Sequence, residues 1–175
     1  KLTFPSVISS ILRIGAIPQY IDFDKNLQLK NNFNESKILN ADYILITHAY
    51  GIPQNSNTID TILKLNKKII LIEDISHSQG ATIKNKIVTA RSAASFMSMQ
   101  GDKAINAGEG GVVITNSDEV YKKLIYLSHL NRKTPSENNL NSLSTIGFIG
   151  KGRMNPLGAI TATNDIKNLS KRNKI

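Results

Sequence analysis

The sequence predicts an α/β fold in which helices flank a mostly parallel sheet. Two runs, Tyr43 to Thr47 and Lys68 to Glu73, carry apolar residues at consecutive positions, as strands buried on both faces do. Thr58 to Leu65, which lies between them, has its apolar residues at helical spacing. Two strands joined through a helix form a right-handed crossover, and such strands are parallel. The chain of 175 residues is long enough for one domain and contains no internal repeat.

The N-terminal part predicts one helix and one further strand. Pro5 has a backbone angle suited to a first helical turn, and apolar residues then recur at helical spacing as far as Gly15. We therefore expect a short helix between these two residues. Ile17 to Phe23 is a compact run of β-prone residues, which predicts a strand.

The second half of the chain predicts two more strands and two more helices. The strands are Ser92 to Met97 and Gly111 to Thr115. Asn116, with a glutamate three residues later, has the form of a helix-start box and precedes an apolar stripe. Residues 133–144 are mostly polar and predict a loop, after which Pro156 begins the last helix.

Composition restricts the classes of function. The absence of cysteine excludes disulfide bonds, thiolate nucleophiles and cysteine-ligated metals, and it fits a reducing compartment, so we expect a cytoplasmic protein. No apolar run approaches the roughly 18 residues that cross a bilayer, so we expect no membrane association. The chain starts without a methionine and ends within the last predicted helix, which indicates a fragment.

The net charge of +9 raises the alternative of a basic nucleic-acid-binding domain. Lysines are scattered along the chain, and the one dense basic stretch is Lys167 to Lys174. Solvated helix faces explain this distribution better than a nucleic-acid surface does. A basic surface would also suit an anionic substrate, such as a nucleotide-linked sugar. We therefore expect no nucleic-acid partner and rank that class of function last.

Three groups of residues lie where ligands of open α/β sheets gather, at strand ends and helix starts. Glu73 to Ala81 begins with two acids, of which Asp74 suits either a ligand contact or a helix cap. Ser98 to Gly111 contains Lys103, followed by glycines. A lysine that attacks a carbonyl has to be held near the sheet, and glycines permit that approach. Gly150 to Leu157 places positive charge at a helix start, which suits a phosphate or a carboxylate but is also found at ordinary helix starts.

Two common phosphate motifs are excluded by the order of these residues. A Walker loop has its lysine after the glycines, whereas Lys103 precedes them. A dinucleotide fingerprint requires Gly-x-Gly-x-x-Gly at the start of a helix after a strand, and the sequence has none. We also predict no metal site.

Taken together, these motifs resemble the DegT/DnrJ/StrS family of sugar aminotransferases. The resemblance rests on Glu-Asp-x-x-His-x-x-Gly-Ala from Glu73, Ser-x-x-x-x-Lys from Ser98, the Gly-Glu-Gly-Gly that follows, and Arg-Met from Arg153, in this order. It extends from Thr3 to about Lys171. Members of this family are pyridoxal-phosphate enzymes of the aspartate-aminotransferase fold, so the resemblance implies a fragment of the fold type I large domain.

The resemblance implies roles toward pyridoxal 5'-phosphate for five residues. Lys103 corresponds to the lysine that bonds covalently to the cofactor, and Asp74 to the aspartate that pairs with the pyridine nitrogen. His77 corresponds to the residue near the ring hydroxyl, Ser98 to the phosphate-binding serine, and Phe4 to the aromatic that stacks on the ring. From the residues alone, His77 could equally be a buried histidine satisfied by the backbone, and Phe4 a core residue.

One departure from the family pattern bears on the substrate. Lys151 stands where many members have an asparagine that reaches the phosphate of the partner subunit's cofactor. Together with Ser98-Met99-Gln100 and Asn155-Pro156-Leu157, it resembles the branch that includes keto-inositol aminotransferases. The resemblance thus implies that Lys151 and Arg153 meet the substrate or a partner subunit's phosphate in a homodimer.

The implied reaction transfers an amino group from glutamate or glutamine to a nucleotide-linked keto-sugar or a keto-cyclitol. Residues 1–175 would form part of the large cofactor-binding domain, without the N-terminal segment and the C-terminal small domain of the family. These missing parts leave a non-catalytic remnant as the main alternative. Dehydration is disfavoured because family members that dehydrate have histidine in place of the lysine, and Lys103 is present.

Overall fold

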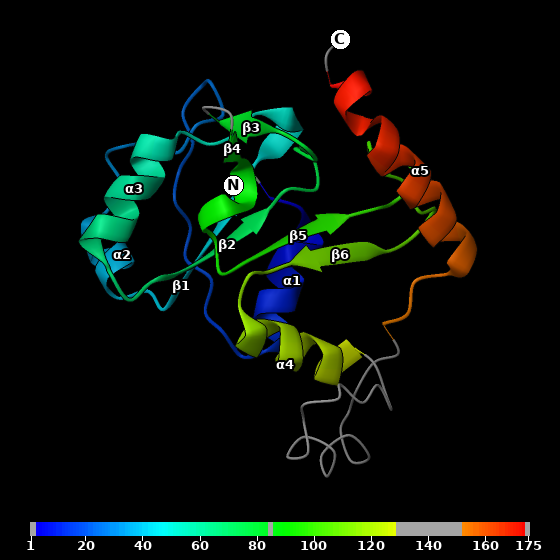
Figure 1. Cartoon of the computed structure of the whole chain (residues 1–175). Helices are drawn as coiled ribbons and strands as arrows, with labels where there is room; N and C mark the ends of the chain where they lie inside the picture. Colours follow the sequence, from blue (N-terminus) through cyan, green and yellow to red (C-terminus); the bar gives the residue numbers. More distant parts are fainter. Residues whose placement is uncertain (1–2, 84–85, 129–151, 174–175) are drawn as a thin grey trace.

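A computed structural model describes residues 3–83, 86–128 and 152–173. In Figure 1, α2 and α3 lie together on the β1 side of a central sheet, whereas α5 lies on the other side, beyond β5 and β6. In chain order the elements are α1 (Pro5–Arg13), α2 (Glu35–Leu39), β1 (Tyr43–Thr47), η1 (Ala49–Gly51), α3 (Ser56–Leu65), β2 (Ile70–Asp74), β3 (Thr82–Ile83), β4 (Lys86–Ile87), η2 (Val88–Arg91), β5 (Ala94–Ser98), β6 (Gly111–Ile114), α4 (Asp118–Ser128) and α5 (Pro156–Arg172), where η marks a 3-10 helix.

The central sheet has four strands in the order β1-β2-β5-β6. β1, β2 and β5 are parallel neighbours, and β6 is antiparallel to β5. This arrangement confirms the predicted α/β fold with a mostly parallel sheet and flanking helices. β1 has the predicted bounds, whereas β2 and β5 each begin and end slightly later in the sequence than predicted.

Helices α1, α3, α4 and α5 confirm the four predicted helices. Asn55 and Asn155 cap α3 and α5, because each side-chain oxygen accepts a backbone N–H of the first turn. At the start of α4 the predicted box is displaced by one residue. The hydroxyl of Ser117, rather than the side chain of Asn116, accepts the N–H of Val120 at 3.3 Å.

The strand predicted from Ile17 to Phe23 is wrong. Within this segment Phe23 alone forms a bridge, which is antiparallel and pairs it with Leu29. Ile17 is 88% exposed, and Pro18 has no N–H to donate to a neighbouring strand. The start of the run is therefore exposed, and the segment is irregular although Ile21 and Phe23 at its end pack against the core.

Helix α2, the hairpin of β3 and β4, and the 3-10 helices η1 and η2 were not predicted. Helix α2 has five residues and buries Ile38 alone, so it is shorter than the window in which helical periodicity becomes visible. The hairpin of β3 and β4 has two residues in each strand. The loop predicted at residues 133–144 lies outside the described residues.

Two clusters of buried apolar side chains form the core. The first packs β1 and β2 against α3, and the second extends from the end of β2 through β5 to α5. The second cluster consists of Ile75, Val88, Met97, Met99, Ile105, Ala107 and Ala162. The segment that follows Lys103 is therefore anchored in the core. No helix in the described part of the chain is both long and apolar enough to cross a membrane.

Candidate active site

The sheet brings the predicted site residues to one edge. In the parallel register Thr47 pairs with Asp74, and Asp74 pairs with Phe96, so β1, β2 and β5 end side by side. Ser98 is the last residue of β5. The carboxyl ends of these strands thus carry Asp74 and Ser98 together, at the edge where ligands of open α/β sheets bind.

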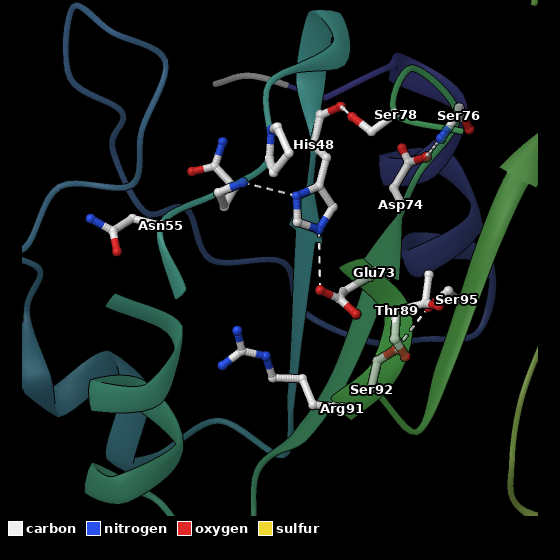
Figure 2. Close-up of polar contacts among 12 residues, drawn as sticks. His48, Asn55, Glu73, Asp74, Ser76, Ser78, Thr89, Arg91, Ser92 and Ser95 are labelled. Atoms are coloured by element: carbon white, nitrogen blue, oxygen red, sulfur yellow. Dashed lines mark hydrogen bonds and ion pairs between the residues drawn. The ribbon is translucent and has the colours of Figure 1, made fainter. Parts of the chain in front are cut away.

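Asp74 is a buried carboxylate at the end of β2. It is 4% exposed, and its Oδ1 accepts the backbone N–H of Ser76 at 3.0 Å (Figure 2). It forms no ion pair within the described residues. Asp74 therefore stabilises the turn that follows β2, but one hydrogen bond only partly offsets the burial of a charge. A cationic ligand atom would complete its coordination.

The two serines at this edge belong to adjacent segments. The backbone N–H of Ser98 donates to Oγ of Ser76 at 2.9 Å, which joins the end of β5 to the turn after β2. Oγ of Ser98 accepts the N–H of Gln100 at 3.3 Å. Both serines therefore lie at this edge of the sheet, and their hydroxyls can donate hydrogen bonds to an anionic oxygen.

Lys103 lies in the connection between β5 and β6. Its backbone N–H donates to the carbonyl of Gln100 at 3.0 Å, which closes a turn. Its side chain is 13% exposed, and Nζ lies 3.3 Å from Oδ2 of the exposed Asp102. The structure thus places this connection, residues 99–110, beside the strand ends, and we call it the Lys103 loop. Within the described residues, however, the ammonium pairs with Asp102 and not with Asp74.

Two glycines permit the close packing that was predicted around the lysine. Gly110 has φ +141°, in the region that favours glycine, and a Cβ there would lie 3.3 Å from Cε of Met154. Gly158, in the first turns of α5, is buried, and a Cβ there would lie 2.4 Å from the carbonyl oxygen of Ala107. Helix α5 therefore contacts the backbone of the Lys103 loop directly.

His77 and Phe4 lie at the same edge, and both are exposed. Nδ1 of His77 accepts the N–H of Tyr50 at 3.3 Å, and the two rings lie 5.7 Å apart. Phe4 is 69% exposed, and the neighbouring Thr3 bonds to Thr47 at the end of β1. Exposure excludes the alternatives of a buried histidine and a core phenylalanine.

Of the two basic residues predicted to meet a substrate or a phosphate, Lys151 and Arg153, the structure describes Arg153. Arg153 is exposed just before α5 and forms no ion pair with a described residue. Lys151 lies outside the described residues.

Sequence reasoning missed a buried polar pair beneath the site, His48 and Glu73 (Figure 2). Both are fully buried. Nδ1 of His48 accepts the N–H of Gln54 at 3.0 Å, so the ring proton is on Nε2, which donates to Oε1 of Glu73 at 3.1 Å. Oε2 of Glu73 has no described partner. Glu73 belongs to the recognised motif, whereas no local signal marks His48.

The chain matches the model of the DegT/DnrJ/EryC1/StrS aminotransferase family over residues 1–174. GDP-perosamine synthase of Escherichia coli O157:H7 is 32% identical over 127 residues, which make up 71% of this chain and 35% of that protein. L-glutamine:scyllo-inosose aminotransferase of Streptomyces griseus is 32% identical over 123 residues, which make up 68% of this chain and 28% of that protein.

Solved structures show the same fold. The aminotransferase from Psychrobacter cryohalolentis has a TM-score of 0.76 at 24% identity and covers 97% of this chain. The aminotransferase TlmJ from Streptoalloteichus hindustanus has a TM-score of 0.81 at 17% identity, again over 97% of this chain. The chain spans about a third of the length of the two curated relatives and 45% of each of these two structures. It belongs to the DegT/DnrJ/EryC1/StrS aminotransferase family.

Proposed function

We propose that this chain carries a large part of the pyridoxal-phosphate site of an aminotransferase, with Lys103 as the lysine that bonds to the cofactor. The observation that supports this most is the environment of Asp74. Its carboxylate is 4% exposed and has no cationic partner in the described part of the chain. A protonated pyridine nitrogen is a cation of the required kind.

The other side chains at this edge fit the remaining groups of the cofactor. The hydroxyls of Ser76 and Ser98 can donate to a phosphate, and the exposed ring of Phe4 can stack on a heterocycle. Because Nδ1 of His77 already accepts a hydrogen bond, its Nε2 carries the proton and can donate to a ring hydroxyl. The donor set therefore fits pyridoxal phosphate.

Bound pyridoxal phosphate would supply an electron sink for the substrate carbon. Asp74 would keep a proton on the ring nitrogen by its negative charge. Nζ of Lys103 would first hold the cofactor and then, once released, carry a proton to and from the substrate carbon. The Lys103 side chain is 13% exposed, which fits a lysine held in a largely enclosed position beside the strand ends.

The relatives support two classes of amino acceptor. One is named as a GDP-perosamine synthase and the other as a scyllo-inosose aminotransferase that uses L-glutamine. We therefore propose a nucleotide-linked keto-sugar or a keto-cyclitol as acceptor and glutamate or glutamine as donor. Lys151 and Arg153 are the proposed contacts to the substrate or to a partner subunit's cofactor phosphate.

We also propose a homodimer. Helices α1 and α5 expose apolar side chains, with Leu157 at 72% and Ile160 at 66% exposure on α5. Such side chains in a group are typical of surfaces that another subunit covers. Sedimentation equilibrium should give twice the chain mass of 19.2 kDa, and a monomer at all concentrations would contradict the dimer.

The cofactor site is tested by mixing the chain with pyridoxal phosphate and recording the visible absorption spectrum. Borohydride reduction and peptide mapping then locate the attachment, with Lys103→Ala as the control. We expect one band, bleached by glutamate, and attachment at Lys103. No band, or attachment scattered over exposed lysines, would favour the non-catalytic remnant, an alternative consistent with a chain that spans about a third of its relatives.

A further inference from the structure

Gln79 connects the turn that follows Asp74 to the loop that carries Lys103. It is 4% exposed. Its Nε2 donates to the carbonyl of Ser98 at 2.8 Å, and its Oε1 accepts the N–H of Ile105 at 2.6 Å. A carbonyl can only accept and an N–H can only donate, so these two partners determine the orientation of the amide.

The two partners of Gln79 flank the lysine. Ser98 ends β5 before Lys103, and Ile105 follows it, so one carboxamide spans both ends of the short segment between them. Ile105 is also a member of the second core cluster. Other elements also bind this segment: Oγ of Ser76 accepts the N–H of Ser98 at 2.9 Å, and the guanidinium of Arg172 on α5 donates to the carbonyl of Ala104 at 3.0 Å. Gln79 differs from both because its one side chain binds the segment on either side of Lys103. Gln79 therefore relates the segment to the strand that carries Asp74.

We propose that Gln79 is a positioning residue for Lys103. The proposal rests on the proposed function, because it assumes that Lys103 and Asp74 act on one bound molecule. Two groups that act on opposite ends of a small cofactor have to be held within a fraction of an ångström of each other. Gln79 provides that link, because it lies five residues after Asp74 in the segment that leaves β2, and it binds the backbone on both sides of Lys103.

The bridge between Ser98 and Ile105 depends on the carboxamide of Gln79. The end of the side chain has to donate to Ser98 and accept from Ile105 at the same time, and among unbranched side chains of this length an amide or a protonated carboxylic acid does both. Methionine has nearly the same length but makes neither bond. An ionised glutamate accepts from Ile105 but cannot donate to Ser98, and burial together with a facing carbonyl raises the pKa of such a carboxyl.

A matched control residue exists elsewhere in the chain. Gln54 is also fully buried, and it also bridges two backbone groups: Oε1 accepts the N–H of Leu29 at 2.8 Å and Nε2 donates to the carbonyl of Leu27 at 2.7 Å. Gln54→Met removes the same two kinds of hydrogen bond as Gln79→Met. It does so in a loop that does not carry Lys103.

The experiment measures amide hydrogen exchange of Ile105 and Leu29 by NMR in the cofactor-free chain. In Gln79→Met we expect the protection of Ile105 to fall by about tenfold or more while Leu29 is unchanged, and the reverse in Gln54→Met. In Gln79→Glu the protection of Ile105 should recover as the pH falls and the new carboxyl becomes protonated. Equal protection of Ile105 in the wild type and Gln79→Met would overturn the proposal.

A second measurement addresses the position of the lysine. Attachment of pyridoxal phosphate to Lys103, trapped by borohydride, should become slower by about tenfold in Gln79→Met and remain unchanged in Gln54→Met. Unchanged attachment in Gln79→Met refutes the positioning role even if exchange increases. If the wild type shows no attachment, the proposed function fails instead, and the exchange data still decide whether Gln79 holds the loop. Should Gln79→Met not fold, Gln79→Glu at low and high pH gives the same comparison.

Discussion

Substitution of Gly158 by alanine tests the packing of α5 on the Lys103 loop. The new Cβ would lie 2.4 Å from the carbonyl oxygen of Ala107. The Cβ is fixed to the backbone of α5, and the atom it meets is a backbone carbonyl oxygen, so no side chain can move to relieve the clash. Helix α5 or the Lys103 loop therefore has to move by somewhat less than 1 Å. Overpacking of this kind costs about 1–3 kcal/mol, and a backbone clash lies at the upper end of that range. The gain in helix propensity offsets about 1 kcal/mol.

We therefore expect Gly158→Ala to lower the free energy of unfolding by about 1–2 kcal/mol. Urea denaturation followed by circular dichroism measures this change. Ser170→Ala is the control, since Ser170 is exposed on the same helix and the change affects propensity alone. The control should raise stability by a few tenths of a kcal/mol. A Gly158→Ala variant as stable as the wild type would refute the tight contact between α5 and the loop.

Three further predictions concern charged groups. Asp74→Asn should raise the free energy of unfolding of the cofactor-free chain by about 1 kcal/mol, because it removes a buried charge but keeps the acceptor for Ser76. In the chain mixed with pyridoxal phosphate, the same change should slow the loss of the visible band on addition of glutamate by about hundredfold or more. Glu73→Ala should cost about 3 kcal/mol or more in urea denaturation, since it strands the buried Nε2–H of His48, whereas Glu73→Gln retains that acceptor and should lose much less. The N–H of Asn106 and, second, the guanidinium of Arg172 hold the pKa of Asp165 below its ordinary value. The contribution of Asp165 to stability is therefore present above about pH 4 and is lost as the pH falls through the lowered pKa. Asp165→Asn should show a smaller loss of stability on acidification, and a pH profile identical to that of the wild type would contradict this role.

The parallel part of the sheet was predictable from the apolar runs of its strands, although in the structure one face of β1 is buried and the other is partly buried or exposed. β1 and β2 carry uninterrupted apolar runs, and a helix with its own periodicity separates them. The antiparallel direction of β6 was predictable in principle. The connection from Ser98 to Gly111 lacks a helical pattern, and parallel neighbours need a crossover that usually contains a helix.

The segment from Ile17 to Phe23 shows why some expectations fail. β-propensity describes how well a residue fits a half-buried pleated surface, and it does not state whether such a surface is present. Ile17 is 88% exposed, and although Ile21 and Phe23 pack against the core, no neighbouring strand pairs with the run beyond the single bridge at Phe23 within the described residues. Helix α2 is the opposite case: it forms but was not predicted, because its buried face consists of one residue, Ile38.

The place of the candidate residues was predictable, but the bonds that hold them were not. Asp74 and Ser98 end strands and Lys103 follows one, and parallel strands end at one edge, so the proximity of these residues follows from the fold. The partners of Gln79 are 19 and 26 residues away in the sequence. No local pattern indicates such bonds, since they depend on the register between β2 and β5 and on the path of the loop.

The Lys103 loop is held from two sides by different chemistry. On the sheet side a neutral carboxamide, that of Gln79, binds Ile105, and on the helix side the carboxylate of Asp165 accepts the N–H of Asn106 at 3.0 Å. Acid weakens the bond between Asp165 and Asn106, because the carboxylate becomes protonated, and leaves the bond between Gln79 and Ile105 intact. A lysine that exchanges bonds with a ligand needs a mobile side chain on a fixed backbone. Holding the backbone at consecutive residues on opposite sides provides this combination, because neither bond involves the side chain of Lys103.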